Sequence, residues 1–244
     1  MTSAVIIAAG RGSRLAHLTD SVPKCMMRIH GETLLDRQLS NFEEMGIYSI
    51  AAVVGYKKEA ISARGIPVFI NSEWNITGIF HSLMKADRWL SSVETIVSYG
   101  DIFYPQALIN ELLESAGDIV VCFDPDWLDL WSARSENPLT DAESFRVSPE
   151  GILQDIGGKV VSAQDVQGQY MGLMKFTPKG WEELKALSQS SGIIAETIDI
   201  TSILSAALDH GAVINTLACR GEWGEVDTPS DLDLYNSRQN NASR

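Results

Sequence analysis

A short apolar strand that runs directly into a glycine-rich loop constrains the fold of this chain more than any other feature. Residues 5–9 are all apolar, and Gly10 and Gly12 follow them closely. A short apolar run without polar alternation is typical of a strand that is buried on both faces, as in a parallel sheet. We therefore expect a strand at residues 5–9, followed by a loop.

A helix is expected next, over residues 33–46. Thr33 and Asp36 resemble a capping box at its start, and Gly46 is a natural C-terminal stop. Apolar residues recur between them at helical spacing: Leu35, Leu39 and Phe42. This part of the chain is therefore predicted to be a strand, loop and helix unit.

The same alternation continues along the chain. We predict strands at residues 50–54, 68–70, 95–99 and 118–123, and helices at residues 57–64, 80–90 and 107–115. Alternating strands and helices imply a mostly parallel sheet with helices on both faces. The expected fold class is α/β, with a Rossmann-like mixed, mostly parallel sheet.

The pattern changes after Asp124. Residues 124–146 are rich in tryptophan and contain Pro138, so we predict an irregular lid or substrate-binding segment there. Pro149 and Gly151 then predict a hairpin between strands at 145–147 and 152–156. The predicted elements that follow are strands at 170–176 and 213–218, and helices at 181–187, at 202–210 and after Pro229.

A single domain is expected. The chain has 244 residues and is 45% hydrophobic, which is enough to bury a full core. No internal repeat or linker divides it. We assign residues 1–236 to one domain and expect the polar end, residues 237–244, to be disordered.

The charge is strongly negative overall but positive at the start of the chain. A net charge of -13 argues against a surface for nucleic acids or for anionic membranes, because both need basic residues. In the first thirty positions, however, four cations accompany only one acidic residue, Asp20: Arg11, Arg14, Lys24 and Arg28. We infer a local site for a polyanionic ligand.

The cysteines and the N-terminus favour an unprocessed cytoplasmic protein. Cys25, Cys122 and Cys219 lie far apart with no C-x-x-C pair, so neither a zinc site nor a disulfide framework is expected. The start has no basic segment, and Gly10 interrupts the apolar stretch before it could serve as a signal or membrane segment. The sequence leaves both a monomer and a homodimer open.

The glycine loop at residues 10–15 fits neither of the common phosphate-binding motifs. Leu15 stands where a dinucleotide fingerprint needs its third glycine, and no Gly-Lys-Ser/Thr follows to make a P-loop. The glycines alone would equally suit a tight turn. With Arg14 and Lys24 nearby, backbone amides and cations could together hold a triphosphate.

Two aspartates stand where an α/β sheet places its ligands. Asp101 follows the predicted strand at 95–99, and Asp227 precedes the helix that we expect to begin at Pro229. Either could instead be an ordinary loop residue or helix cap. Their hard oxygens suit Mg2+ that is shared with phosphates. Glu225 lies two residues before Asp227, so on an extended segment both side chains face the same way.

The motif AAGRGSRL at residues 8–15, followed by Pro23 and Lys24, resembles the signature of nucleoside-triphosphate transferases that activate sugar phosphates, choline phosphate and phosphonates. The segments YGDI, GQYMGL and GEWGEVDTPSDL resemble the phosphocholine cytidylyltransferase-like branch. Within it, residues 127–143 look most like CTP:phosphonate cytidylyltransferases. The similarity covers nearly the whole chain, and it implies the nucleotide-diphospho-sugar transferase type of fold.

This resemblance implies a role for each part of the site. Asp101 and Asp227 would hold Mg2+, and Lys24 and Arg14 would be the catalytic cations. The implied nucleotide-binding residues are Ala8, Ala9, Gly10, Arg11, Gly12, Ser13, Asn75, Thr77, Gly78, Ser82 and Tyr99. The implied acceptor-binding residues are Trp127, Trp131, Arg134, Glu143, Tyr170, Trp223 and Glu225.

The chemistry of the acceptor stays open at this point. The four aromatic residues of that set predict either a cage for a quaternary ammonium group or simple packing beneath a lid. Arg134, Arg146 and Lys159 instead favour an acceptor that carries a carboxylate or other extra negative charge. The residues alone support both interpretations.

The implied reaction is transfer of CMP from CTP to a small phosphonate or phosphomonoester, with release of pyrophosphate. Three alternatives remain: a choline-phosphate cytidylyltransferase, a sugar-1-phosphate nucleotidyltransferase that uses UTP or dTTP, and a nucleotide-binding regulator without activity. Lys24, Asp101 and Asp227 disfavour the regulator, because a protein without catalysis does not need them.

Overall fold

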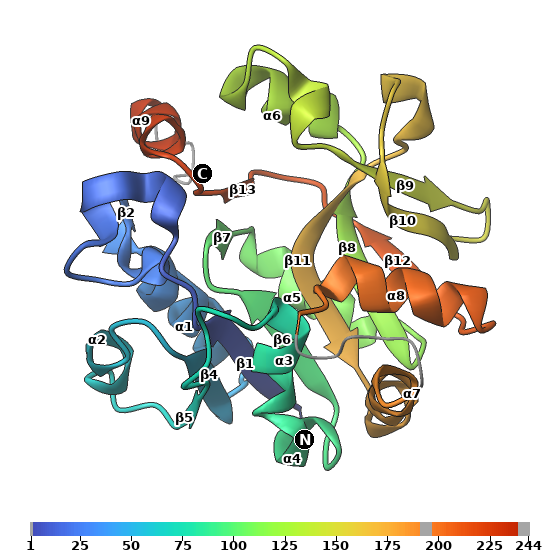
Figure 1. Cartoon of the computed structure of the whole chain (residues 1–244), viewed down its shortest axis with the longest axis horizontal. Coiled ribbons are helices and arrows are strands. Elements are labelled where there is room, and N and C mark those ends of the chain that lie inside the picture. Colours follow the sequence, from blue (N-terminus) through green and yellow to red (C-terminus); the bar gives the residue numbers. More distant parts are fainter. Residues whose placement is uncertain (1, 191–196, 239–244) are drawn as a thin grey trace.

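The computed structural model describes residues 2–190 and 197–238, and a seven-stranded sheet forms its centre (Figure 1). The strand order is β12-β8-β11-β6-β1-β4-β5. Strand β11 is antiparallel to β6 and β8, and the other pairs are parallel. The strands are β1 (Ser3–Ala8), β4 (Ile50–Val54), β5 (Val68–Ile70), β6 (Thr95–Tyr99), β8 (Ile119–Asp124), β11 (Gln169–Phe176) and β12 (Asn215–Ala218). The predicted fold class, an α/β fold with a mostly parallel mixed sheet, is confirmed.

Helices cover both faces of this sheet (Figure 1). They are α1 (Leu34–Glu44), α2 (Glu59–Ser62), α3 (Ile79–Met84), α4 (Asp87–Leu90), α5 (Gln106–Glu114), α6 (Trp127–Arg134), α7 (Pro178–Ser188), α8 (Ile200–Asp209) and α9 (Pro229–Ser237). None of the helices in the described ranges is both long and apolar enough to cross a membrane.

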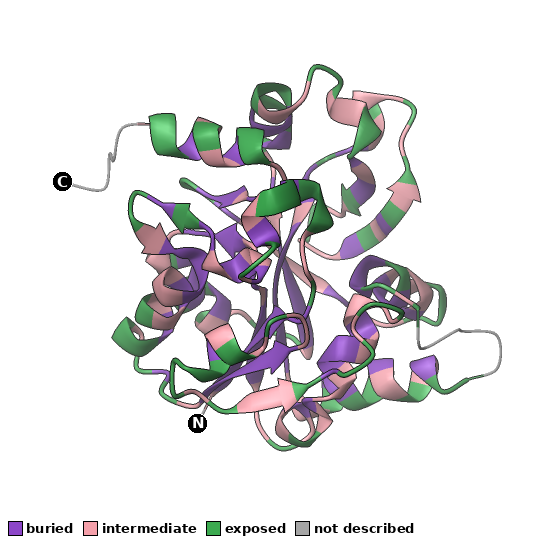
Figure 2. Cartoon of the chain, turned by 60° about the vertical axis from the view of Figure 1, so that its left-hand side comes forward, coloured by how far each residue is buried: buried purple, intermediate pink, exposed green. Residues whose placement is uncertain are grey.

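Strand β1 is buried on both sides, which explains its unbroken apolar sequence (Figure 2). Ile6 belongs to the same core as Phe42 of α1. Val5, which points to the other face, belongs to the core that contains Phe80 of α3 and Trp181 of α7. The glycine loop therefore begins at the end of a strand that packing holds on both faces.

The predicted helices at 57–64 and 80–90 are shorter than expected. Lys57 adopts a positive φ of 47°, so α2 begins only at Glu59. In the second segment, the backbone N–H groups of Lys85 and Ala86 donate to carbonyls three residues back, which ends α3 before α4 begins.

The prediction of irregular structure at residues 124–146 is wrong. This segment contains α6, a 3-10 turn at Pro138–Thr140 and the start of β9 (Glu143–Val147). Trp127, Leu130 and Trp131 are buried on one side of α6, and their spacing is that of an amphipathic helix. The predicted hairpin is confirmed, since β9 pairs antiparallel with β10 (Leu153–Lys159).

The C-terminal segment is ordered further than expected. Ser237 ends α9, and the side chain of Asn236 accepts a hydrogen bond from His30 N (2.8 Å) and donates to Arg28 O (3.2 Å). These contacts attach α9 to the hairpin of β2 (Arg28–Ile29) and β3 (Glu32–Thr33). The rest of the predicted disordered tail, residues 239–244, lies outside the described residues.

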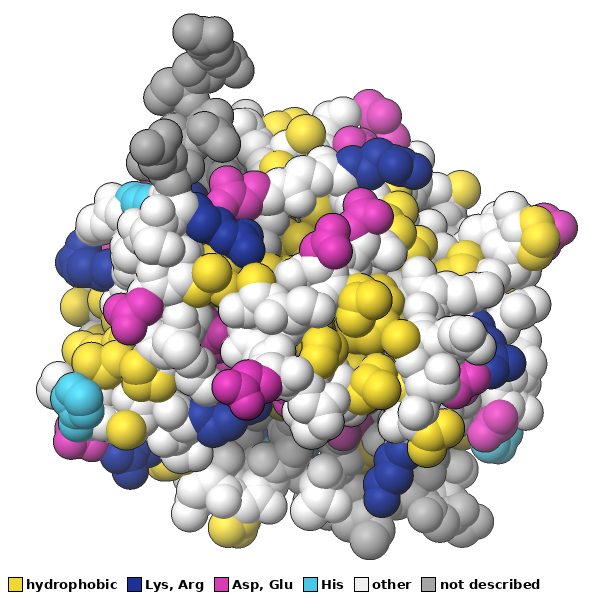
Figure 3. Space-filling view, turned by 90° about the horizontal axis from the view of Figure 1, so that it is seen from above, with side chains coloured by type: hydrophobic (Ala, Val, Ile, Leu, Met, Phe, Trp, Pro, Cys, Tyr) yellow, Lys and Arg dark blue, Asp and Glu magenta, His cyan; other side chains and the backbone are white. Residues whose placement is uncertain are grey.

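The top of the molecule, where β13 and α9 lie in Figure 1, carries acidic and basic side chains interspersed with apolar ones (Figure 3). No broad basic surface is visible on this face within the described part of the chain. This face therefore agrees with the local site for a polyanion that the sequence predicts.

Candidate active site

Two short strands that the sequence did not predict bring the candidate metal ligands together. Strand β7 (Ile102–Phe103) directly follows Asp101 and pairs antiparallel with β13 (Gly224–Glu225). The N–H of Val226 also donates to the carbonyl of Asp101, at 3.0 Å. This pairing places one carboxylate oxygen each of Asp101, Glu225 and Asp227 within 4.8 Å of one another.

Lys24 reaches into the middle of these carboxylates. Its Nζ donates to Asp101 Oδ2 at 2.6 Å and also to Asp227 Oδ1. Gly12 makes room for this side chain: its φ is +72°, and a Cβ on it would lie 2.9 Å from three carbons of Lys24. The glycine at this position therefore serves the lysine as well as the turn.

The protonation states within the cluster follow from burial and charge. Burial by itself would lower the pKa of Lys24, but Asp101, Glu225 and Asp227 together raise it above its ordinary value. Burial would raise the pKa of Asp227, yet Lys24 and neighbouring hydrogen bonds lower it to about 2. Burial, followed by the charges of Asp227 and Asp101, raises the pKa of Glu225 well above its usual range. Near neutral pH, Lys24 and Asp227 are thus charged, and Glu225 keeps its proton to higher pH than an ordinary glutamate does.

The three carboxylates fit a divalent cation. Within the described residues, Asp101 Oδ1 is buried and has no hydrogen-bond partner, so it is an acceptor without a donor. Hard oxygen donors at this separation are the ligands that Mg2+ takes in sites that it shares with phosphates. The donor set therefore fits the Mg2+ that the sequence predicts.

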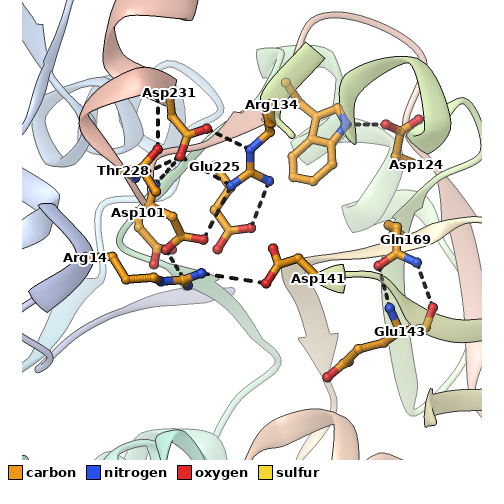
Figure 4. A network of polar contacts seen from close by, with 12 residues as sticks. Arg14, Asp101, Asp124, Arg134, Asp141, Glu143, Gln169, Glu225, Thr228 and Asp231 are labelled. Carbon is orange, nitrogen blue, oxygen red and sulfur yellow. Dashed lines mark hydrogen bonds and ion pairs between the residues drawn. The ribbon is translucent and has the colours of Figure 1, made fainter. Parts of the chain in front are cut away.

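Arg14 and Arg134, which are labelled in Figure 4, come from different elements and both contact Asp227. Arg14 Nη2 lies 2.8 Å from Asp227 Oδ1, and its Nη1 lies 3.6 Å from Asp141 Oδ1. Arg134, at the end of α6, approaches Asp227 Oδ2 at 3.4 Å. The side chain of Arg14 is 59% exposed and that of Arg134 only 7%, so only Arg14 is accessible to an incoming ligand.

Two adjoining cavities, of about 180 and 160 Å³, lie beside the glycine loop and share Ile7, Gly10 and Asp101. The predicted nucleotide-binding residues that line them are Ala8, Ala9, Gly10, Gly12, Thr77, Gly78, Ser82 and Tyr99. Arg11 does not line either cavity, because it pairs with Asp20 at 2.7 Å. Ser13 and Asn75 are exposed outside both cavities. Trp74, which the sequence analysis missed, lines the larger cavity.

A buried asparagine organises the wall of the larger cavity. Asn71 Nδ2 donates to Thr77 Oγ1 and to Ser82 Oγ, both at 2.9 Å, and its Oδ1 accepts from Glu73 N. Gly78 is required between them, because a Cβ there would lie 2.3 Å from the carbonyl oxygen of Ile198. The segment is thus both a turn and a cavity wall.

A third cavity, of about 220 Å³, lies on the other side of the carboxylates. The predicted acceptor-binding residues that line it are Trp131, Glu143, Tyr170 and Glu225. Trp127, Trp223 and Arg134 do not line it: the indole N–H groups donate to Val166 O and Asp124 Oδ2, so these rings pack in the core. An aromatic cage made of all four predicted rings is therefore not present.

The third cavity is more acidic than predicted. Asp141, Gln169, Asp199 and Thr201 line it without having been singled out in the sequence, and among its described lining residues Arg14 is the one cation. Burial, followed by the charges of Asp199 and Asp141, raises the pKa of Glu143 despite a hydrogen bond with Thr201. Since these carboxylates come from separate segments, the sequence held no spacing that could reveal them.

The Lys24 cluster lies between two kinds of cavity. A cation cluster with carboxylates between a glycine-loop cavity and a second cavity suits transfer of a nucleotide. The family model of the MobA-like NTP transferase domain matches residues 4–195 of this chain. The chain belongs to this family. It is a nucleotidyltransferase, as predicted.

Two curated relatives match over nearly their full lengths. CTP:phosphoglutamine cytidylyltransferase from Campylobacter jejuni is 32% identical, over 95% of this chain and 98% of the relative. UTP–glucose-1-phosphate uridylyltransferase AglF from Haloferax volcanii is 33% identical, over 96% and 95%. Among solved structures, the inositol-1-phosphate CTP transferase from T. maritima has a TM-score of 0.76 and 21% identity, over 96% of this chain and 95% of that one. The last similarity shows the fold.

Proposed function

We propose that this protein transfers the cytidylyl group of CTP to an oxygen of a small phosphonate or phosphomonoester, with release of pyrophosphate. The observation that carries the proposal is the position of the Lys24 cluster. Asp101 lines both cavities beside the glycine loop, whereas Asp227 and Glu225 line the acidic cavity. The cluster thus lies at the boundary between a donor cavity and an acceptor cavity.

The residues at this boundary suit in-line transfer without a covalent intermediate. The oxygen of a phosphonate or phosphate acceptor is already anionic near neutral pH, so no general base is required. Catalysis then rests on positioning and on neutralising charge. In this mechanism Lys24 bridges the acceptor oxygen and the α-phosphate, and Arg14, exposed at the mouth of the acceptor cavity, neutralises the leaving pyrophosphate.

Mg2+ would be held by Asp101 and Asp227, with Glu225 beside them. When bound, it supplies Lewis-acid stabilisation of the charge that develops on the phosphoryl oxygens. Lys24 must then leave its carboxylate partners for the phosphates, which its long, flexible side chain allows.

The choice of CTP rests on the Campylobacter relative, which is named for CTP and aligns over 98% of its own length. A second candidate, transfer of UMP from UTP to a sugar 1-phosphate, is favoured by the Haloferax relative at 33% identity. Thr77, Ser82 and the backbone of Gly78 offer a neutral polar wall that suits a pyrimidine in either case.

The acceptor is proposed to have an amino or hydroxyl group at the end remote from phosphorus. Asp141, Glu143 and Asp199 would repel a carboxylate there. Among small phosphonates, 2-aminoethylphosphonate and 2-hydroxyethylphosphonate have such an end group, whereas phosphonoformate carries a carboxylate and is disfavoured. The buried ion pairs of Arg134 also remove the main sequence argument for a second anionic group.

The decisive experiment incubates the protein and Mg2+ with each of CTP, UTP, ATP and GTP. Every nucleotide is combined with a panel of phosphonates, phosphate esters and sugar 1-phosphates, and pyrophosphate is measured. We expect release only with CTP and a phosphonate or phosphomonoester. Release with UTP and a sugar 1-phosphate would support the second candidate, and no release with any combination would refute both.

Two variants connect this activity to the cluster. Asp101→Asn and Asp227→Asn should each nearly abolish pyrophosphate release, because each removes a charged oxygen from the proposed Mg2+ site. Asp233→Asn is the matched control, since Asp233 is an exposed aspartate on α9 that belongs to neither cavity. Near-normal turnover in both cluster variants would contradict the metal assignment.

A further inference from the structure

Arg134 is the most deeply buried cation in contact with the cluster, and its surroundings do not match a role in binding the acceptor. It ends α6, its side chain is 7% exposed, and it does not line the acceptor cavity. Its guanidinium lies 5.1 Å from the ring of Trp131. The side chain is thus held between that ring and the segment that carries Asp227.

The guanidinium of Arg134 lies among three carboxylates (Figure 4). Nε donates to Asp231 Oδ1 at 3.0 Å, and Nη2 lies 3.4 Å from both Asp231 Oδ2 and Asp227 Oδ2. Nη1 lies 3.6 Å from Glu225 Oε2 and has no hydrogen-bond partner within the described residues. A planar fork with fixed donor directions can hold both oxygens of Asp231 and one oxygen of Asp227 in one arrangement, which a single ammonium cannot do.

Asp231 acts on the same residue through the backbone. Its Oδ2 accepts hydrogen bonds from the N–H groups of Asp227 and Thr228, both at 2.8 Å, as part of the capping box that begins α9. Arg134 and Asp231 therefore fix the backbone of Asp227 and one of its carboxylate oxygens at once.

The two carboxylate oxygens of Asp227 therefore have different partners. Oδ2 faces the buried Arg134, and Oδ1 faces Lys24 and the exposed Arg14. Oδ1 is therefore the oxygen that shares the ammonium of Lys24 with Asp101. Without the fork, the carboxylate could rotate about its last bond and offer either oxygen.

We propose that Arg134 is a positioning residue that holds Asp227 so that Oδ1 alone is presented to the divalent cation of the transfer reaction. This role rests on the proposed function, because it concerns the same Mg2+ site. It differs from the role in acceptor binding that the sequence suggests for Arg134.

Arg134→Lys tests the proposal, because it keeps the positive charge and removes the fork. The affinity for CTP is measured without acceptor by isothermal titration calorimetry, once with Mg2+ and once with EDTA. We expect the gain in affinity that Mg2+ provides to fall at least tenfold, while the affinity in EDTA stays within about threefold. Turnover should fall by a similar or larger factor, with the KM of the acceptor within about threefold.

Lys175→Met is the control for loss of a buried cation as such. Lys175 is 2% exposed, donates to backbone carbonyls of Leu113 and Ser115, and lies five residues along β11 from Tyr170, roughly 17 Å away. This variant should melt at a lower temperature yet keep the full effect of Mg2+. If Arg134→Lys does not fold, Asp231→Asn carries the same measurement, since it keeps an oxygen for the N–H of Asp227 and weakens the contact with Arg134.

Three results would overturn the proposal. The first is an unchanged effect of Mg2+ on CTP affinity in Arg134→Lys, and the second is an equal loss of that effect in Lys175→Met. The third is a raised KM for the acceptor with unchanged turnover in Arg134→Lys. The absence of any Mg2+ effect in the native protein would overturn it as well. Pyrophosphate release by the native protein, measured in parallel, decides the proposed function separately.

Discussion

Replacing Lys24 with methionine should make the protein bind a divalent cation more tightly while it loses the ability to transfer a nucleotide. The ammonium of Lys24 lies at 2.6 Å from Asp101 Oδ2 and also contacts Asp227, so it occupies the side of both carboxylates that a cation would use. Mg2+ without nucleotide must displace this charge in the native protein. In Lys24→Met there is no competitor for the cation, but the residue that we propose to bridge the acceptor and the α-phosphate is absent.

The size of the effect can be worked out from burial. The side chains of Lys24 and Asp227 are 14% and 4% exposed, and removing one partner of a buried pair costs about 3 to 5 kcal/mol. For a chain of this length, 1 kcal/mol corresponds to about 2 to 4 °C, so the variant should melt about 6 to 20 °C below the native protein in EDTA. A ligand at a concentration a hundredfold above its Kd raises the free energy of unfolding by about 2.7 kcal/mol. Saturating Mg2+ should therefore restore roughly 5 to 11 °C in the variant.

Differential scanning calorimetry with and without Mg2+ measures both effects. Native protein should gain at most about 2 °C from Mg2+ alone, because cation binding and loss of the Lys24 pairs nearly offset each other. Lys179→Met, which removes an 81% exposed lysine paired with Asp118, should behave like the native protein. An equal gain from Mg2+ in native protein and in Lys24→Met would refute the idea that lysine and metal compete for one position.

Three further predictions concern residues around the cluster. Asn71→Ala leaves the hydroxyls of Thr77 and Ser82 without their shared donor. It should therefore destabilise the fold by about 1 to 3 kcal/mol, which calorimetry measures, and raise the KM for the nucleotide, which steady-state kinetics measures. Gly12→Ala should lower turnover at least tenfold while the melting temperature falls by only a few degrees, because the new Cβ displaces Lys24; normal turnover would contradict the contact. Asp87 has a lowered pKa, because hydrogen bonds from Trp181, Lys185 and Ser91 outweigh its desolvation. The contribution of Asp87 to the free energy of unfolding is therefore present above the unfolded pKa of about 3.9 and is lost as the pH falls through the folded pKa. Asp87→Asn should lower the free energy of unfolding by about 1 kcal/mol at pH 7 and should have no effect in strong acid. Urea titrations at both pH values measure this difference.

The central strands β1, β4 and β6 could be predicted from sequence because nearly all of their residues are buried, whereas the partly exposed edge strand β5 was located by the residues that flank it. Strands β4, β5 and β6 have the predicted bounds, and each is flanked by polar or turn residues that end the apolar run. In contrast, α6 was missed although Trp127, Leu130 and Trp131 have helical spacing. The proline and polar residues that follow lowered the helical signal of the whole segment, and only packing against other elements reveals the buried face.

The candidate site was predictable where it depends on local sequence. The glycine loop, Lys24 and the strand-end Asp101 carry their signal in adjacent residues, and the structure brings them together. The partners of Arg134 depend on long-range packing, since they come from a segment about ninety residues further along the chain. For the same reason Asp141 and Asp199, on separate segments of the acceptor cavity, had no detectable pattern.

The pairing of β7 with β13 also determines when the site can form during synthesis. These strands have two residues each, yet their ladder joins Asp101 to a segment that is made more than a hundred residues later. A chain still on the ribosome can fold the glycine loop and the strands around β1, but it has no Asp227 until more than a hundred further residues have been made. Nascent chains of this protein are therefore expected to form the proposed donor cavity well before they form the complete carboxylate cluster, and transfer activity should begin only after α9 has docked.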